Sequence, residues 1–164
     1  GSRSQAIGKA FAAAYPGRKP ADALFVDTFL RIPALKTARI KAEQGGAPVY
    51  NYLFTWDTPV LGGFAMSYHT AEIPFVMNSL ALTETMHGNG SEAKALADKM
   101  SRAWVAFART GNPNTGGLPQ WEAYTSQNGA TMIFDNKPVV KYHHDAELLR
   151  LLKPDGRFLR DKAA

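Results

Sequence analysis

The chain has 164 residues, of which 45% are hydrophobic and 20% are charged, and its formal net charge is +5. These values are usual for a globular domain and indicate neither a disordered chain nor a membrane-spanning helix. The absence of cysteine excludes disulfides, thiolate catalysis and cysteine-based metal sites. Basic residues are dispersed except near the C-terminus, where acidic residues lie among them, which predicts a solvated tail and no nucleic-acid surface.

The N-terminal part of the chain predicts two helical regions. Apolar residues recur at helical spacing over residues 7–14, and the Tyr-Pro-Gly sequence of residues 15–17 ends this helix. A second helical region runs from about residue 21 to residue 44, with an interruption or restart at Pro33. The pair Gly45-Gly46 then predicts a left-handed C-cap.

The next segment predicts a strand. Val49 to Phe54 is a nearly continuous run of apolar, β-branched and aromatic residues, which is typical of a strand buried on both faces. A helix followed by such a strand predicts a parallel α/β sheet. Nothing before residue 48 reads as a strand that could pair with its second side. We therefore expect residues 1–164 to be a single partial domain, a piece of a larger sheet.

The remaining elements follow a loop-rich stretch over residues 55–90. A long helix is predicted from Ser91, which we take as the N-cap, to Gly111, and one face carries apolar residues: Leu96, Met100, Ala103, Trp104 and Phe107. Residues 131–134 and 138–142 predict two short strands, and residues 145–152 a last short helix.

The loop after the first strand carries the residue best suited to catalysis. His69 lies in the segment AMSYHTAEIPFVM of residues 65–77, three positions before Glu72 and next to the apolar cluster of residues 73–76. The ordinary pKa of histidine, about 6.5, allows it to accept and return a proton near neutral pH. Loops beyond the carboxyl ends of parallel strands are where α/β proteins place such groups.

Three segments together resemble the type-B carboxylesterases, the cholinesterase-like α/β-hydrolases. They are the histidine segment, APVYNYLF of residues 47–54, and WVAFARTGNPN of residues 104–114 with Trp121 downstream. The chain departs from the family at residues 77–79, where an aromatic residue and a glycine are usual. The resemblance implies the C-terminal part of an α/β-hydrolase fold, with the last parallel strands of the sheet and their flanking helices. It also implies that His69 is the general base of a Ser-His-acid triad for ester hydrolysis.

Other parts of that machinery are missing from the sequence. No serine lies in a G-x-S-x-G turn, and no glycine-rich oxyanion segment is present. In this fold the acid comes before the histidine, so we expect it in sequence upstream of this chain; four acidic residues precede His69 as weaker alternatives, Asp22, Asp27, Glu43 and Asp57. Asp27 is better explained as a cap of the helix after it. Alone, the chain is expected to be inactive and to self-associate, and its partners are the N-terminal portion of the enzyme and a small ester.

The remaining polar residues give weaker signals. Glu72 is expected to bond backbone donors of the histidine loop, because two residues do not make a metal site. We expect His87 to lie on a loop surface, and the adjacent pair His143-His144 to point to opposite faces of a strand. Phe64, Met66 and Tyr68 are expected to line the substrate pocket. No metal, cofactor or membrane contact is expected. The alternative function is a non-catalytic, cholinesterase-like interaction module.

Overall fold

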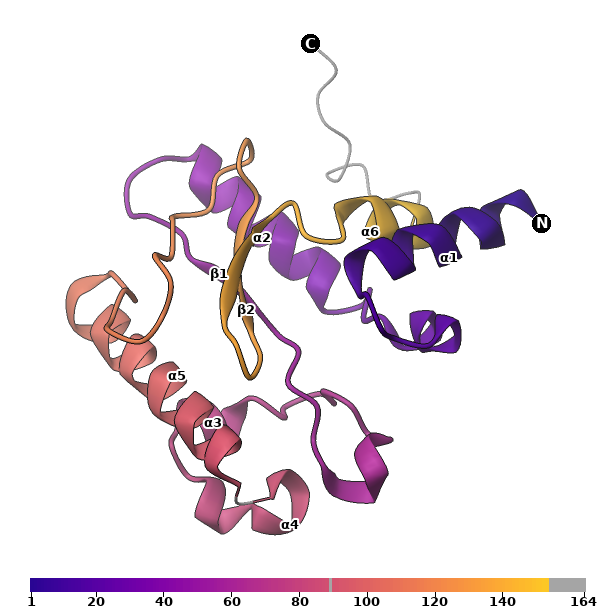
Figure 1. Cartoon of the computed structure of the whole chain (residues 1–164). Helices are drawn as coiled ribbons and strands as arrows, with labels where there is room; N and C mark the ends of the chain where they lie inside the picture. Colours follow the sequence, from indigo (N-terminus) through magenta and orange to yellow (C-terminus); the bar gives the residue numbers. More distant parts are fainter. Residues whose placement is uncertain (89, 154–164) are drawn as a thin grey trace.

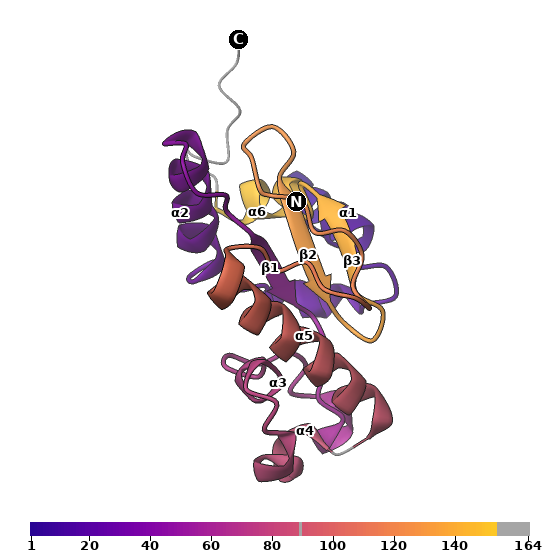
Figure 2. The ribbon, with the colours of Figure 1, turned by 90° about the vertical axis from the view of Figure 1, so that its left-hand side faces the viewer.

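A three-stranded mixed sheet lies at the centre of the molecule. The computed structural model describes residues 1–88 and 90–153. The strands β1 (Asn51–Phe54), β2 (Ala130–Phe134) and β3 (Val139–Tyr142) lie in the order β1-β2-β3. β1 runs parallel to β2, with Asn51 opposite Thr131, whereas β2 and β3 form an antiparallel hairpin (Figures 1 and 2). The expected α/β class and the parallel pairing are confirmed.

β1 lies at the edge of this sheet. Within the described residues no strand pairs with its outer side, and all four of its residues are only half-buried. The central strand β2, in contrast, is buried along its whole length. The prediction that the segment from Val49 to Phe54 is buried on both faces is therefore wrong for this chain: a strand is fully buried only where layers cover both faces and neighbouring strands cover both edges, and β1 has an open edge.

The long helix α5 (Ser91–Thr110) covers one face of the sheet (Figure 2). Its buried residues Leu96, Met100 and Ala103 share a core with Phe75 and Phe134. The helix begins one residue earlier than predicted: Gly90 is the N-cap, and Ser91 is the first helical residue. At the other end the predicted stop is confirmed by Gly111, which takes the left-handed conformation with φ of 74°.

The N-terminal segment forms α1 (Ser2–Ala14), a 3₁₀ turn η1 (Pro20–Phe25) and α2 (Arg31–Glu43). The expected break comes before Pro33 and not at it, because Pro33 lies in the first turn of α2, where no intrahelical N–H bond is lost. Asp27 accepts hydrogen bonds from the amides of Phe29 and Leu30 at 2.8 and 2.9 Å, so it caps the turn that leads into this helix.

The last helix, α6 (Ala146–Leu152), packs against α1 on the side of the sheet opposite α5 (Figures 1 and 2). Three side chains join this layer to α2. The two terminal nitrogens of the Arg31 guanidinium, Nη1 and Nη2, donate to the fully buried carboxylate of Asp145 at 2.7 and 2.9 Å. The hydroxyl of Tyr15 donates to the same carboxylate. Burial lowers the pKa of Arg31, but its bonds to Asp145 more than offset this, and the net shift is upward.

The loop-rich stretch after β1 contains four short helical turns. They are η2 (Val60–Gly63), α3 (Ile73–Val76), η3 (Leu80–Leu82) and α4 (Glu84–His87). α3 packs against α5, and α4 contacts both η2 and η3. This region therefore forms a folded lobe beyond the carboxyl end of β1 (Figure 1). Among the described residues, no helix combines the length and the apolar character needed to cross a membrane.

Aromatic rings fill the space between β1 and α5. Tyr52 meets the rings of Trp104, Trp121 and Phe134 edge to face, at centroid distances of 6.1, 6.4 and 5.6 Å. A cavity of about 150 Å³ opens among the rings of Tyr52, Trp104 and Trp121 and the neighbouring Tyr50. Burial, with a smaller contribution from the charge of Glu72, raises the pKa of Tyr52 to about 12.

This shift predicts a loss of stability at alkaline pH. The unfolded chain releases the Tyr52 proton near pH 10, whereas the folded chain retains it up to about pH 12. The unfolded state thus binds fewer protons in this window, and the free energy of unfolding falls as pH rises from about 10 to about 12. Urea unfolding at several pH values measures the slope. Tyr52→Phe, which keeps the ring, should make the slope shallower, and an unchanged slope would exclude Tyr52 as its source.

Candidate functional site

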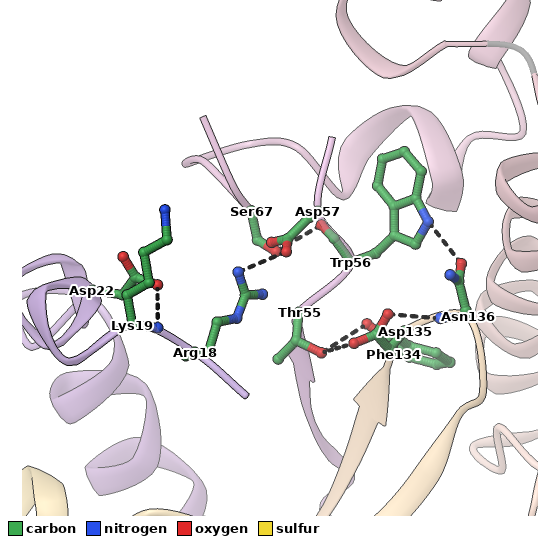
Figure 3. Close-up of polar contacts among 10 residues, drawn as sticks. All are labelled: Arg18, Lys19, Asp22, Thr55, Trp56, Asp57, Ser67, Phe134, Asp135 and Asn136. Carbon is green, nitrogen blue, oxygen red and sulfur yellow. Dashed lines mark hydrogen bonds and ion pairs between the residues drawn. The ribbon is translucent and has the colours of Figure 1, made fainter. Parts of the chain in front are cut away.

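The site begins where the chain leaves the carboxyl end of β1. The amide of Thr55 donates to the carbonyl of Phe134 at 2.9 Å, and its hydroxyl donates to the Asp135 carboxylate at 3.0 Å (Figure 3). The Trp56 indole N–H donates to the side-chain oxygen of Asn136 at 3.0 Å. These bonds fix the start of the loop against the end of β2, its parallel neighbour.

Two further contacts hold the loop close to this strand end. The Ser67 hydroxyl donates to the Trp56 carbonyl at 2.7 Å, which brings the returning part of the loop back to its start (Figure 3). Arg18, from the segment between α1 and η1, pairs with Asp57 at 2.6 Å. The hydrogen bond that Arg18 donates to the Asp57 carboxylate raises the pKa of Arg18. The segment that precedes His69 is therefore anchored on both sides.

His69 itself is exposed, and its imidazole makes no hydrogen bond to any residue that the structure describes. The backbone on each side of it is unusual. Met66 and Thr70 both have positive φ, 46° and 74°, although neither is glycine. Residues other than glycine rarely take this conformation, and where they do the surrounding structure must hold them there. The turn therefore presents an accessible imidazole on a constrained loop.

The three residues predicted to line a pocket lie in this same loop. Phe64 is 79% exposed, and Met66 is half-buried. Tyr68 is also half-buried, and its hydroxyl lies 2.9 Å from Nε2 of His87. The role of the three residues in substrate binding stays a prediction.

Three expectations about this region are corrected. His87 is 3% exposed and ends the helix α4, so it does not lie on a loop surface. The cue that could have indicated its burial is its position at the end of a short helix, which begins at Glu84. The Glu72 carboxylate bonds no backbone donor of the described residues; only its backbone carbonyl accepts, from Phe75 and Val76. The pair His143-His144 follows β3 and is not part of a strand.

The acidic residues that precede His69 are all bonded elsewhere, and none of them contacts its imidazole. The expectation of an upstream acid therefore stays a prediction. The partners of the four residues are the Lys19 amide for Asp22, the Phe29 and Leu30 amides for Asp27, Arg39 for Glu43, and Arg18 for Asp57. His144 is packed edge-on against Tyr15, and burial lowers its pKa. In the described part of the chain no three histidine or acidic residues are grouped as metal ligands.

Comparisons with known proteins show the family to which this chain is related. The model of the Carboxylesterase family matches residues 17–151. The para-nitrobenzyl esterase of Bacillus subtilis is 31% identical over 133 residues, which cover 80% of this chain and 26% of that enzyme. Carboxylesterase 5A of the dog, Canis lupus familiaris, is 39% identical over 109 residues, 62% of this chain and 19% of that protein.

The fold agrees with the sequence. A solved esterase from Clostridium hathewayi, described as able to hydrolyse aliphatic aromatic polyesters, superimposes with a TM-score of 0.84 and 35% identity. The match covers 93% of this chain and 30% of that one, so the chain spans less than a third of these relatives' length. These relatives are α/β-hydrolases. The chain belongs to the carboxylesterase family.

Proposed function

We propose that this chain is the C-terminal part of a serine carboxylesterase and supplies the catalytic histidine, His69. The single observation that carries the proposal is the position of His69, exposed on a constrained loop beyond the carboxyl end of β1, in a chain of the carboxylesterase family. A serine esterase needs a base at such a position to remove the proton of its nucleophile.

The chemistry assigned to His69 has two stages, and in each the imidazole first takes a proton and then gives it up. In acylation its imidazole takes the proton of the serine hydroxyl as that oxygen attacks the ester carbonyl, and it then gives the proton to the leaving alcohol. In deacylation it takes a proton from the water that attacks the acyl carbonyl, and it returns this proton to the serine oxygen as the acyl–oxygen bond breaks and the carboxylic acid leaves. Its exposure supports this role, because the imidazole must reach groups that belong to another part of the protein.

The serine, the oxyanion donors and the triad acid would come from an upstream portion of the same enzyme, as a sheet continued beyond β1. Two features support such a partner. Within the described residues the outer edge of β1 is unpaired, and large apolar side chains around the His69 loop are exposed, including Leu61 and Phe64 at 79% and Leu82 at 87%. Without the partner, the same surfaces should cause the chain to self-associate.

The substrate is proposed to be a small carboxylic ester. Phe64, Met66 and Tyr68 belong to the loop that carries His69 and would face the acyl or alcohol group. Their side chains offer apolar contact area with a single hydroxyl, which suits an uncharged ester better than a charged one.

Hydrolysis of a short-chain nitrophenyl ester tests the proposal. The chain alone should give no saturable hydrolysis and no labelling by a serine-directed phosphonate, and mixing with the upstream portion should produce both. Saturable, phosphonate-sensitive hydrolysis by the chain alone would contradict the proposal. A folded complex without activity would instead favour a non-catalytic interaction module.

A further inference from the structure

His87 is a buried polar residue without an obvious reason to be polar. Its ring is 3% exposed and lies edge-on to Phe75, at a centroid distance of 5.7 Å. Its Nδ1 atom is buried and has no hydrogen-bond partner among the described residues. A leucine or phenylalanine would avoid this unsatisfied nitrogen, since a buried polar atom without a partner is destabilising. The other ring nitrogen supplies the explanation.

Nε2 of His87 is 2.9 Å from the hydroxyl of Tyr68, which directly precedes His69. Burial raises the pKa of Tyr68, so its hydroxyl keeps its proton and can donate to Nε2. Among the described residues, only two side-chain hydrogen bonds tie residues 64–70 to the rest of the protein: this one, and that of Ser67 to the Trp56 carbonyl. Because His69 has no such bond, its position depends on these neighbours.

The helix that bears His87 is itself fastened to the base of the loop. The Thr58 hydroxyl donates to the Met86 carbonyl, and the Thr58 amide donates to the Met66 carbonyl at 3.3 Å. Gly88, with φ of 66°, comes so close to the loop that a Cβ there would lie 3.1 Å from the Pro59 ring. α4 is therefore held in place against the base of the loop. The hydrogen bond between His87 and the Tyr68 hydroxyl fixes Tyr68 relative to this helix.

We propose that His87 is a positioning residue for the catalytic histidine: through the Tyr68 hydroxyl it holds the strained turn that presents His69. This inference rests on the proposed function of His69. It assigns His87 no contact with substrate. Met66 and Thr70, which lie on either side of His69, both have positive φ. The support from His87 would have to maintain these two conformations.

The test uses the chain combined with the upstream portion, and the substrate is a nitrophenyl ester. His87→Leu should lower kcat by about 10- to 100-fold with KM within about threefold, because a displacement near 1 Å of a catalytic group has this effect. His87→Gln, whose amide can still bond the Tyr68 hydroxyl, should restore most of kcat. Tyr68→Phe should also lower kcat, and the double variant Tyr68→Phe/His87→Leu should be no slower than the slower single variant.

His144→Leu is the matched control. His144 is also a partly buried histidine with one unpartnered ring nitrogen, but it lies beside Tyr15 at the α1–α6 end of the molecule, far from α4 (Figures 1 and 2). Its substitution should leave kcat unchanged. Amide hydrogen exchange of residues 64–72 in this chain gives a second readout: exchange should be faster in His87→Leu and Tyr68→Phe, and unchanged in His144→Leu.

The outcomes separate the two proposals. If His69→Ala retains activity, the proposed function fails. If His69→Ala is inactive while His87→Leu and Tyr68→Phe keep the parent kcat and loop exchange, only the positioning role is overturned. Equal losses in His87→Leu and His87→Gln would also overturn it, because bulk and not the hydrogen bond would then matter. Should His87→Leu fail to fold, the amide exchange of residues 64–72 in Tyr68→Phe decides the question, because this readout does not depend on any contact of Tyr68 with the substrate: faster exchange supports the positioning role, and unchanged exchange overturns it.

Discussion

Replacement of His69 by alanine is expected to lower kcat of the assembled esterase by about 10⁴- to 10⁶-fold. The imidazole is the only group assigned to take the serine proton, and removal of the base from a serine triad costs nearly as much as removal of the whole triad. Because His69 is exposed and makes no hydrogen bond within the described residues, the fold should not change. KM should therefore remain close to that of the parent, and steady-state kinetics with a nitrophenyl ester measures both constants.

His143→Ala controls for the general effect of losing a surface histidine. His143 is exposed, lies after β3, and bonds the Gln127 carbonyl at 2.8 Å. Its substitution should leave kcat within about twofold, because a surface change far from the chemistry rarely matters more. A His69→Ala enzyme with more than about a tenth of the parent kcat would exclude His69 as the base.

The largest expected effect on stability is that of Asp145→Asn. The carboxylate of Asp145 is fully buried and accepts two hydrogen bonds from Arg31 and one from Tyr15. Loss of its charge leaves the guanidinium of Arg31, which is only 18% exposed, without a counter-ion. Such a change usually costs about 3 to 5 kcal/mol. Asparagine tolerates the positive φ of residue 145, 52°, so backbone strain does not contribute. Urea unfolding measures the difference.

Glu147→Gln is the matched control for this prediction. Glu147 also forms two hydrogen bonds with an arginine, Arg150, at 2.8 and 2.6 Å, but both side chains are exposed on α6. Surface ion pairs contribute little to stability, so this variant should unfold at nearly the parent urea concentration. Equal effects of the two substitutions would mean that burial of the Arg31–Asp145 pair is not what stabilises the α1, α2 and α6 layer.

The sequence predicted the helices and strands well where hydrophobic periodicity was strong. The helix α5, its end at Gly111 and the parallel pairing of β1 follow from apolar spacing and from glycine conformations. It failed for the burial of β1, because burial depends on what packs on and beside a strand, and the strand's own residues do not determine this. The position of the helix break near Pro33 was also predicted only approximately. Proline breaks a helix interior but fits a first turn, and only the structure shows that Pro33 lies in the first turn of α2.

The candidate site was predicted only in part for a related reason. His69 could be singled out because a resemblance of local sequence marks it. His87 could not, because a lone histidine before a glycine usually lies on the surface, and its contact with Tyr68 joins residues 19 positions apart through the packing of α4. The partner of Asp145 is farther still, 114 positions away at Arg31, and no local pattern links the two.

The central claim is that this chain completes an esterase by docking on an upstream portion and supplying His69. A competition titration tests it most directly. Ester hydrolysis should rise with added chain and level off at one equivalent of the upstream portion, and the His69→Ala chain added in excess should then suppress it, because it occupies the same surface without a base. Activity that appears without this chain, or that the His69→Ala chain restores as well as the parent does, would contradict the claim.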